Sequence, residues 1–198
     1  MEAPQKSVYL DFETPDSLFK LVEKDENNQF SLKVKEKRVI NYDTYMFVLE
    51  FPNPEWIGGL FPGGHYVFHA MVDGEMISRK YTPISPVNEK GIAEFPIKIY
   101  REHPDFPGKG KFTKHLENNV HVGDSIICEG PIGKTRYFGH GKFKLMKQDI
   151  PTKKNIGFLA AGTGLTPLYT VALASSLAKD GAKLKFLFSN KTKDDILC

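Results

Sequence analysis

The residues best suited to chemistry lie in one short run, residues 79–85, with the sequence Arg-Lys-Tyr-Thr-Pro-Ile-Ser. If this run is extended, alternate side chains share a face, so Arg79 and Tyr81 project together. Pro83 has no N–H to donate to a neighbouring strand, so it ends the strand or places it at an edge. A planar guanidinium beside an aromatic ring and a hydroxyl suits a ligand with a phosphate and a flat ring system, such as a flavin dinucleotide. The structural alternative is a solvated strand face.

A second candidate is the glycine-rich segment 108–113, which precedes a helical pattern over residues 113–118. Glycines let the backbone approach a ligand closely, and the N–H groups at the start of a helix stabilise an anion. The segment therefore predicts a binding site for a pyrophosphate. An ordinary glycine turn with solvated lysines is the alternative that the glycines alone leave open.

Residues 155–167 form a third candidate, because an apolar strand runs into a glycine turn and then into a helix. We expect Thr166 to cap this helix, Pro167 to occupy its first position and Gly181 to end it. One apolar stripe is predicted to face the core, made of Leu168, Val171, Ala172 and Leu177. Residues 183–188 predict a second buried strand. The result is a βαβ unit with a nucleotide-binding turn at the carboxyl end of its first strand.

Neither of the two common nucleotide fingerprints is complete in this sequence. Gly162 and Gly164 give G-x-G, but Pro167 stands at the third glycine position of the dinucleotide pattern. Residues 133–135 look like the end of a P-loop, yet Cys128 stands where that loop requires a glycine. The P-loop ATPase interpretation is therefore rejected.

A globular fold with two parts must position these candidates. The chain has 198 residues, of which 40% are hydrophobic and 26% charged, and its 15 Phe and 8 Tyr are enough to build a sizeable core. Residues 1–30 are expected to form an N-terminal arm. The region that follows contains about six short strands separated by Gly, Pro and Asn turns, which is typical of a small antiparallel β-barrel. We expect this barrel domain over residues 31–145 and an α/β lobe over residues 151–198.

Together, the three motifs resemble the ferredoxin reductase superfamily and, within it, the NADH–cytochrome b5 reductase family. The flavin motif R-x-Y-[ST]-x-x-[ST] of that family is matched by residues 79–85, its phosphate loop G-[GK]-[MF]-[ST] by residues 110–113, and its nicotinamide-side motif G-T-G-[IL]-T-P by residues 162–167. Residues 95–100 are similar to the family strand that lies along the flavin, and residues 103–107 to its H-P-K-F-P segment beside the adenine.

The resemblance implies an FAD-dependent oxidoreductase that passes electrons from NADH or NADPH through the flavin to a one-electron acceptor such as cytochrome b5. Arg79 would bind the FAD pyrophosphate, Tyr81 would pack on the isoalloxazine and Thr82 would lie near flavin N5. The cofactor-binding residues that it implies are Arg79, Tyr81, Thr82, Pro83, Ser85, Lys98, Tyr100, His103, Phe106, Gly110, Lys111, Phe112, Thr113, Gly162, Thr163, Gly164, Thr166 and Pro167. No catalytic residue and no metal ligand is assigned.

The second lobe departs from the family pattern. A complete nicotinamide domain includes a late C-G-P-P motif, whereas Cys198 ends this sequence without the following Gly-Pro. Residues 151–198 are therefore expected to form only part of an NAD-binding lobe, with an exposed sheet face and an open strand edge. This leaves a second hypothesis, in which the chain is a flavin-binding or structural subunit of a larger electron-transfer complex and turns over little or no NADH.

Charge and cysteine content bear on partners and location. A basic stretch in the middle of the chain is either a solvated linker or a surface that attracts an acidic heme protein, and it accompanies no nucleic-acid-binding fold. It consists of Lys134, Arg136, Lys142, Lys144, Lys147, Lys153 and Lys154. With two cysteines, no visible signal peptide and no apolar run long enough to span a bilayer, we expect an intracellular protein. The cytosolic face of a membrane and an organelle such as the mitochondrion are both compatible with this expectation.

Overall fold

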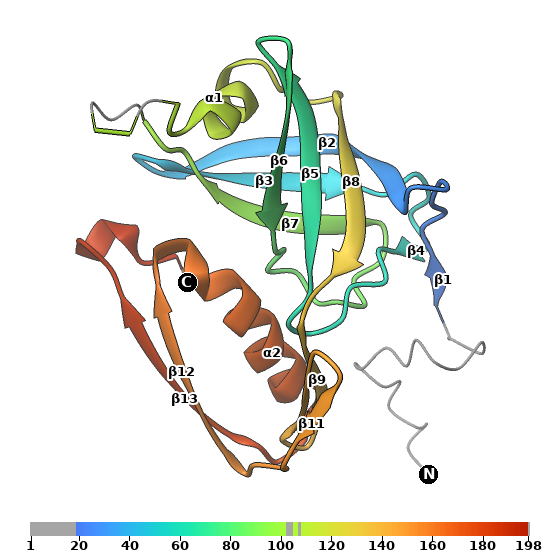
Figure 1. Cartoon of the computed structure of the whole chain (residues 1–198), viewed down its shortest axis with the longest axis vertical. Helices are drawn as coiled ribbons and strands as arrows, with labels where there is room; N and C mark the ends of the chain where they lie inside the picture. Colours follow the sequence, from blue (N-terminus) through green and yellow to red (C-terminus); the bar gives the residue numbers. More distant parts are fainter. Residues whose placement is uncertain (1–18, 102–104, 107, 198) are drawn as a thin grey trace.

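The computed structural model describes residues 19–101, 105–106 and 108–197, and His103 and Cys198 lie outside these ranges. A six-stranded antiparallel sheet forms the first part of the fold (Figure 1), with the strand order β6-β5-β8-β2-β3-β7. Its strands are β2 (Gln29–Asn41), β3 (Thr44–Glu50), β5 (His65–Val72), β6 (Glu75–Tyr81), β7 (Ile92–Lys98) and β8 (Ser125–Ile132). The N–H of Ile84, just after β6, donates to the carbonyl of Glu94 in β7 at 2.8 Å, which joins the two edges of the sheet into a barrel.

The barrel interior follows from alternation along its strands. In β2, Phe30, Leu32 and Val34 are buried while the residues between them are exposed, as expected for a strand with one face on a core. Aromatic rings fill the centre, where Phe68 packs edge-on against Phe95 with ring centroids 4.9 Å apart. The predicted small antiparallel barrel is therefore confirmed, with its core made by alternate residues of each strand.

One helix, α1 (Lys111–Asn118), lies against the barrel, and a lysine secures its carboxyl end. The ammonium of Lys37 in β2 donates to the carbonyls of Leu116, Glu117 and Val120 at 2.9, 2.5 and 2.9 Å. These are carbonyls that a helix end leaves without partners. Beside the barrel, the two-residue strands β1 (Lys20–Leu21) and β4 (Trp56–Ile57) form a short parallel pair.

The second part of the fold contains the predicted βαβ unit. Strand β12 (Asn155–Ala161) leads through the 3₁₀ turn η1 (Gly162–Gly164) into α2 (Leu165–Ala178), and β13 (Lys183–Ser189) pairs parallel with β12. An antiparallel meander of β9 (Thr135–Gly139), β10 (Lys142–Leu145) and β11 (Gln148–Ile150) lies on the other side of α2 (Figure 1). Tyr137, Phe158 and Val171 join the meander, β12 and α2 in a separate small core. A short 3₁₀ turn, η2 (Lys193–Asp195), follows β13.

The ends of α2 differ from the prediction. The helix begins at Leu165, so Thr166 does not cap it and Pro167 is its third residue, where the N–H that proline lacks would have no intrahelical acceptor. The hydroxyl of Thr166 instead donates to the carbonyl of Thr163 at 3.3 Å. Lys179, with φ of 49°, makes the left-handed stop that was expected of Gly181. The predicted apolar stripe is wrong at Leu177, which is 42% exposed.

The expectation that β13 is a buried strand is also wrong. Leu187 is 67% exposed, and Leu159 beside it in β12 is 77% exposed. Among the described residues, α2 covers one face of this two-stranded sheet and leaves the opposite face open. Apolar residues of a parallel strand read as buried from sequence because such sheets are usually covered on both faces. None of the described helices has the length and apolar character needed to cross a membrane.

Candidate cofactor and nucleotide site

A cavity of about 380 Å³, here called the central pocket, opens between the barrel and the second lobe. The end of β6, the end of β7, the start of α1 and the start of α2 all contribute to its wall. Its lining residues are His65, Arg79, Lys80, Tyr81, Thr82, Pro96, Lys98, Tyr100, Gly110, Phe112, Thr113, Thr163, Thr166 and Pro167. Three motifs that are distant in the sequence therefore meet at one cavity.

Arg79 supplies a cation to the central pocket. Its Nη1 donates to the carbonyl of Ser78 at 2.8 Å, and within the described ranges no acid lies at ion-pair distance from its guanidinium. Lys111 differs, because its ammonium lies 3.3 Å from Glu75 and 3.6 Å from Asp73, on the side of α1 away from this pocket. An exposed planar fork with free N–H groups is suited to a phosphate or a carboxylate.

The start of α1 lies beside Arg79 at the same cavity. Gly110 precedes the helix with φ of 81°, a left-handed conformation that favours glycine. The Thr113 hydroxyl donates to the Gly110 carbonyl at 3.1 Å and accepts from the main-chain N–H of Tyr100 at 3.0 Å, which ties this turn to the segment after β7. The N–H groups of Phe112 and Thr113 lie in the first helical turn, where no intrahelical acceptor exists, so they add partial positive charge at the pocket.

Aromatic residues make the apolar wall of the central pocket. The ring of Tyr81 packs against Phe68 and Phe112, with centroid distances of 4.9 and 6.0 Å. Burial raises the pKa of Tyr81 above its ordinary value, so its hydroxyl stays protonated at neutral pH. A rigid, neutral ring at this position can pack on a flat ligand.

His65, at the start of β5, leaves one polar atom unsatisfied at the central pocket. Its Nε2 is buried and has no hydrogen-bond partner among the described residues. Burial and the charge of Lys80 lower the pKa of His65, so its imidazole is neutral at physiological pH. An orphaned buried polar atom costs about 1–3 kcal/mol, so a ligand that bonds to it is favoured.

A second cavity of about 390 Å³, here called the lobe pocket, lies at the carboxyl ends of β12 and β13. It shares Lys98, Tyr100 and Thr163 with the central pocket, so these three residues form a common wall. Its other lining residues are Thr44, Ala161, Gly162, Ser189, Asn190, Lys191, Asp195 and Leu197. This is the edge at which α/β sheets bind ligands.

Two features indicate that a ligand can approach closely at the lobe pocket and at the glycine turn beside it. A Cβ atom added at Gly162 or Gly164 would meet nothing within 4 Å. Gly164 has φ of −65°, so neither its backbone nor protein packing requires glycine there, whereas the close approach of a ligand would. The Oδ1 atom of Asn190 is also buried and has no partner among the described residues.

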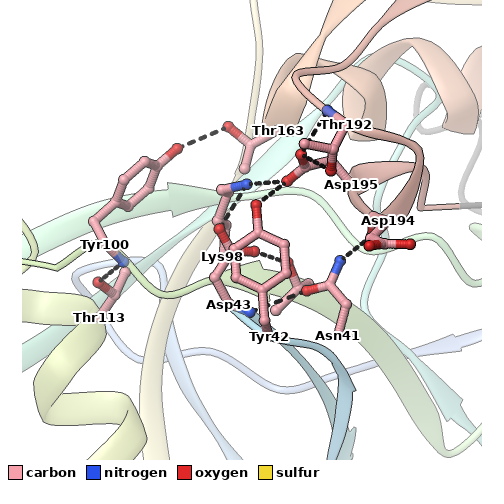
Figure 2. Close-up of polar contacts among 11 residues, drawn as sticks. Asn41, Tyr42, Asp43, Lys98, Tyr100, Thr113, Thr163, Thr192, Asp194 and Asp195 are labelled. Atoms are coloured by element: carbon pink, nitrogen blue, oxygen red, sulfur yellow. Dashed lines mark hydrogen bonds and ion pairs between the residues drawn. The ribbon is translucent and has the colours of Figure 1, made fainter.

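Lys98 lies at the common wall of the two pockets within a group of charged residues (Figure 2). Its ammonium lies 2.8 Å from Asp43 and 2.9 Å from Asp195. Burial alone would lower the pKa of Lys98, but the hydrogen bonds to these carboxylates outweigh it and raise the pKa. Hydrogen bonds from Tyr42, Lys98 and Thr192 lower the pKa of Asp195 well below its usual range.

The structure brings most of the predicted site residues together and leaves several elsewhere. Eleven of them line the central pocket, and Gly162 lines the lobe pocket. Ser85 lies in a different place, where its hydroxyl accepts from the Glu94 N–H at 3.1 Å, and Pro83 lines a small cavity beside it. Phe106 is 60% exposed, with the Lys109 ammonium 5.5 Å from its ring centroid. His103 lies outside the described residues.

Sequence reasoning missed His65, Asn190 and Asp195. His65 belongs to no motif, and its place follows from the pairing of Tyr66 with Tyr81, a register that local patterns do not reveal. Asn190 follows the second parallel strand directly, so the rule that ligands bind at the carboxyl ends of strands could have identified it. Asp195 carried no such signal.

Residues 31–137 match the family described as "Oxidoreductase FAD-binding domain". The chain is 36% identical over 177 residues to NADH-cytochrome b5 reductase 3 of Rattus norvegicus, an alignment that covers 85% of this chain and 58% of that protein. It is 36% identical to Nitrate reductase [NADH] of Volvox carteri over 84% of this chain and 19% of that protein. Thus it spans less than two thirds of these curated relatives.

A solved structure agrees with these matches. The cytochrome b5 reductase domain of Ulva prolifera nitrate reductase superposes with a TM-score of 0.80 at 35% identity, covering 89% of this chain and 67% of that one. The chain therefore belongs to the NADH-cytochrome b5 reductase family of FAD-binding oxidoreductases.

Proposed function

We propose that this chain holds FAD in the central pocket, takes reducing equivalents from NADH in the lobe pocket and passes electrons to a heme protein such as cytochrome b5. The observation that carries this proposal is the common wall of the two pockets, Lys98, Tyr100 and Thr163. Two ligands that meet there are in contact, which hydride transfer requires. The relatives' names, which include NADH and cytochrome b5, support the choice of donor and acceptor.

The residues of the central pocket fit the flavin ring and the phosphates of FAD in their chemistry. A cavity of about 380 Å³ lies within the range of about 300–1,000 Å³ that ligand sites occupy. Arg79 and the N–H groups at the start of α1 hold the two phosphates, while Tyr81 packs against the ring system. His65 Nε2 gains the partner it lacks in the protein alone. When bound, FAD supplies the ability to accept a hydride and release electrons singly.

The lobe pocket is assigned to the nicotinamide nucleotide. Its glycine turn at residues 162–164 lets a ligand approach the protein backbone closely, because the space that side chains at Gly162 and Gly164 would take is empty. Thr166 and Pro167, in the first turn of α2 directly after this glycine turn, line the central pocket. The glycine turn therefore lies between the two ligands. Lys98, Tyr100 and Thr163 orient both ligands, and the aromatic wall limits the access of water. In this proposal the flavin-binding barrel ends with β8 at Ile132, and the nucleotide lobe includes the β9–β11 meander, because Tyr137 packs with Phe158 and Val171. The expected boundaries at residues 145 and 151 therefore move toward the N-terminus.

A second candidate function is a flavin-binding or structural subunit of a larger electron-transfer complex with little NADH turnover. The open face of the β12–β13 sheet favours it, since Leu159 and Leu187 are 77% and 67% exposed. Exposed apolar sheet faces of this kind commonly contact another polypeptide. In either case Lys142, Lys153 and Lys154, all exposed, would attract an acidic partner. Cys128, which is free and buried, is compatible with a reducing intracellular location on the cytosolic face of a membrane or in an organelle.

One experiment separates the two candidates. The full chain is purified with added FAD, its visible spectrum is recorded, and NADH is added without oxygen. Retained flavin whose absorbance NADH bleaches supports the reductase. Retained flavin that light-driven reduction bleaches but NADH does not supports the subunit, and a chain that retains no flavin contradicts both.

A further inference from the structure

The β2–β3 hairpin contacts the segment after β13 through a compact polar cluster, here called the latch (Figure 2). It consists of Tyr42 and Asp43 in the hairpin, Lys98 in β7, and Thr192 and Asp195 around η2. The Tyr42 hydroxyl donates to Asp195 Oδ1 at 2.7 Å, and the Lys98 ammonium lies 2.9 Å from the same oxygen. Thus one carboxylate oxygen from the second lobe accepts two hydrogen bonds from the barrel.

The other oxygen of Asp195 stabilises its own turn. Oδ2 accepts from the Thr192 N–H at 3.0 Å and from the Thr192 hydroxyl at 2.8 Å. The first of these bonds is one half of a capping box at η2. Asp195 is only 6% exposed, so its four hydrogen bonds are partly shielded from water. A carboxylate in this position is fixed in orientation by the lobe and bonded by the barrel at the same time.

The latch lies far from the covalent connection between the barrel and the second lobe. The covalent connection between the two parts runs from β8 to β9, close to where the Tyr137 N–H donates to the Pro62 carbonyl at 3.0 Å and the Gly63 N–H to the Thr170 hydroxyl at 3.3 Å. The latch joins the lobe to the barrel near the carboxyl ends of β12 and β13, away from this connection (Figure 1). Without it, the lobe could pivot about its connection and move β12 and β13 relative to the barrel.

From this geometry we infer that Asp195 is a positioning residue, which holds the second lobe and the Lys98 ammonium where the central pocket and the lobe pocket meet. Lys98 is bonded on one side by Asp43 of the barrel and on the other by Asp195 of the lobe. Its ammonium has three donors, so one N–H is left for a ligand at the common wall. The inference rests on the proposed function, because it assigns the latch a role in bringing the two ligands together.

Three variants test the latch in the full-length chain. Asp195→Asn keeps the size of the side chain but removes its charge, and Tyr42→Phe removes only the hydroxyl on the barrel side. Asp194→Asn is the matched control, because Asp194 contributes to this region through its carbonyl, which accepts from the Asn41 side chain at 2.8 Å. Each variant is compared for flavin content, for hydrogen exchange over residues 41–44 and 192–197, and for the anaerobic rate of flavin bleaching by NADH.

We expect Asp195→Asn to keep its flavin, to exchange faster in both segments, and to be bleached by NADH about 10- to 100-fold more slowly, the effect of a displacement near 1 Å in a reacting pair. Tyr42→Phe loses one hydrogen bond and slows bleaching about twofold to tenfold. Light-driven reduction, which needs no nucleotide, stays unchanged. The two substitutions combined cost less than the product of their separate effects, because they act on one contact.

The inference is overturned if Asp195→Asn matches Asp194→Asn in hydrogen exchange or in the rate with NADH. It is also overturned if the rate falls while exchange over both segments stays as in the unsubstituted chain, since Asp195 would then act other than by holding the lobe. A chain whose flavin NADH never bleaches refutes the proposed function instead. The exchange comparison then decides the latch by itself, with faster exchange in Asp195→Asn alone as the supporting result.

Discussion

Replacing Arg79 with alanine is expected to weaken flavin binding strongly while leaving the fold intact. Among the residues that the structure describes, the guanidinium donates only to the Ser78 carbonyl, so few internal contacts are lost with it. A hydrogen bond to a charged group contributes about 1.5–3 kcal/mol, which predicts a rise in the FAD dissociation constant of about 10- to 150-fold. The lower half of this range is the better expectation, because Arg79 is exposed and solvent screens its charge.

The assay is a fluorescence titration of flavin-free protein with FAD. Arg38→Ala is the matched control, since Arg38 is also an exposed arginine on a barrel strand but lies 3.2 Å from Glu36 and outside the central pocket. Arg79→Lys should fall between the two, because it keeps the charge and loses the planar fork. A dissociation constant for Arg79→Ala within twofold of that of Arg38→Ala would refute the assignment of Arg79 to the phosphates.

Three further predictions concern stability. Lys37→Met should lower the free energy of unfolding in urea by about 1–3 kcal/mol, because three carbonyls at the end of α1 lose their donor, while the exposed Lys35→Met should change it little. Asp180→Asn should lower the melting temperature and speed hydrogen exchange in the β9–β10 turn. The reason is that this buried carboxylate accepts from the Tyr137 hydroxyl at 2.6 Å and from the Ser175 hydroxyl at 2.8 Å. Equal effects from Asp149→Asn would contradict this prediction. For Asp195 the lowered pKa means that its contribution is fully present above the unfolded value of about 3.9 and is lost as the pH falls through the lower folded pKa. Urea titrations of Asp195→Asn and the unsubstituted chain should therefore differ at pH 7 and converge in strong acid, and a constant difference would show that the charge is not responsible.

The motifs predicted the central pocket well because each of them fixes its own local geometry. Arg79 and Tyr81 lie on one strand, and Gly110 directly precedes a helix, so the local chain conformation sets the direction of these groups. The barrel could be predicted for a similar reason, since alternation along β2 reports which face is buried. The glycine at position 164 pointed to a ligand site because neither the backbone conformation nor the packing at that position requires a glycine.

The features that sequence reasoning missed depend on contacts between distant residues. Tyr42 and Asp195 are 153 positions apart, and no local pattern indicates that a hairpin tip and a turn after β13 will meet. Ser85 fits the motif by spacing, but its hydroxyl bonds to β7, a choice that depends on how the sheet closes. Leu177 and Leu187 are apolar residues whose exposure depends on which elements cover α2 and β13. Tertiary packing decided each of these cases.

The central claim is that the two pockets hold a flavin and a nicotinamide in contact at Lys98, Tyr100 and Thr163. It is tested most directly by the anaerobic rate of flavin bleaching with NADH that carries deuterium on one or the other face of nicotinamide C4. A fixed geometry presents only one face to the flavin, so we expect deuterium on that face alone to slow the reaction. Equal rates with both labelled forms, or no bleaching with either, would contradict the account.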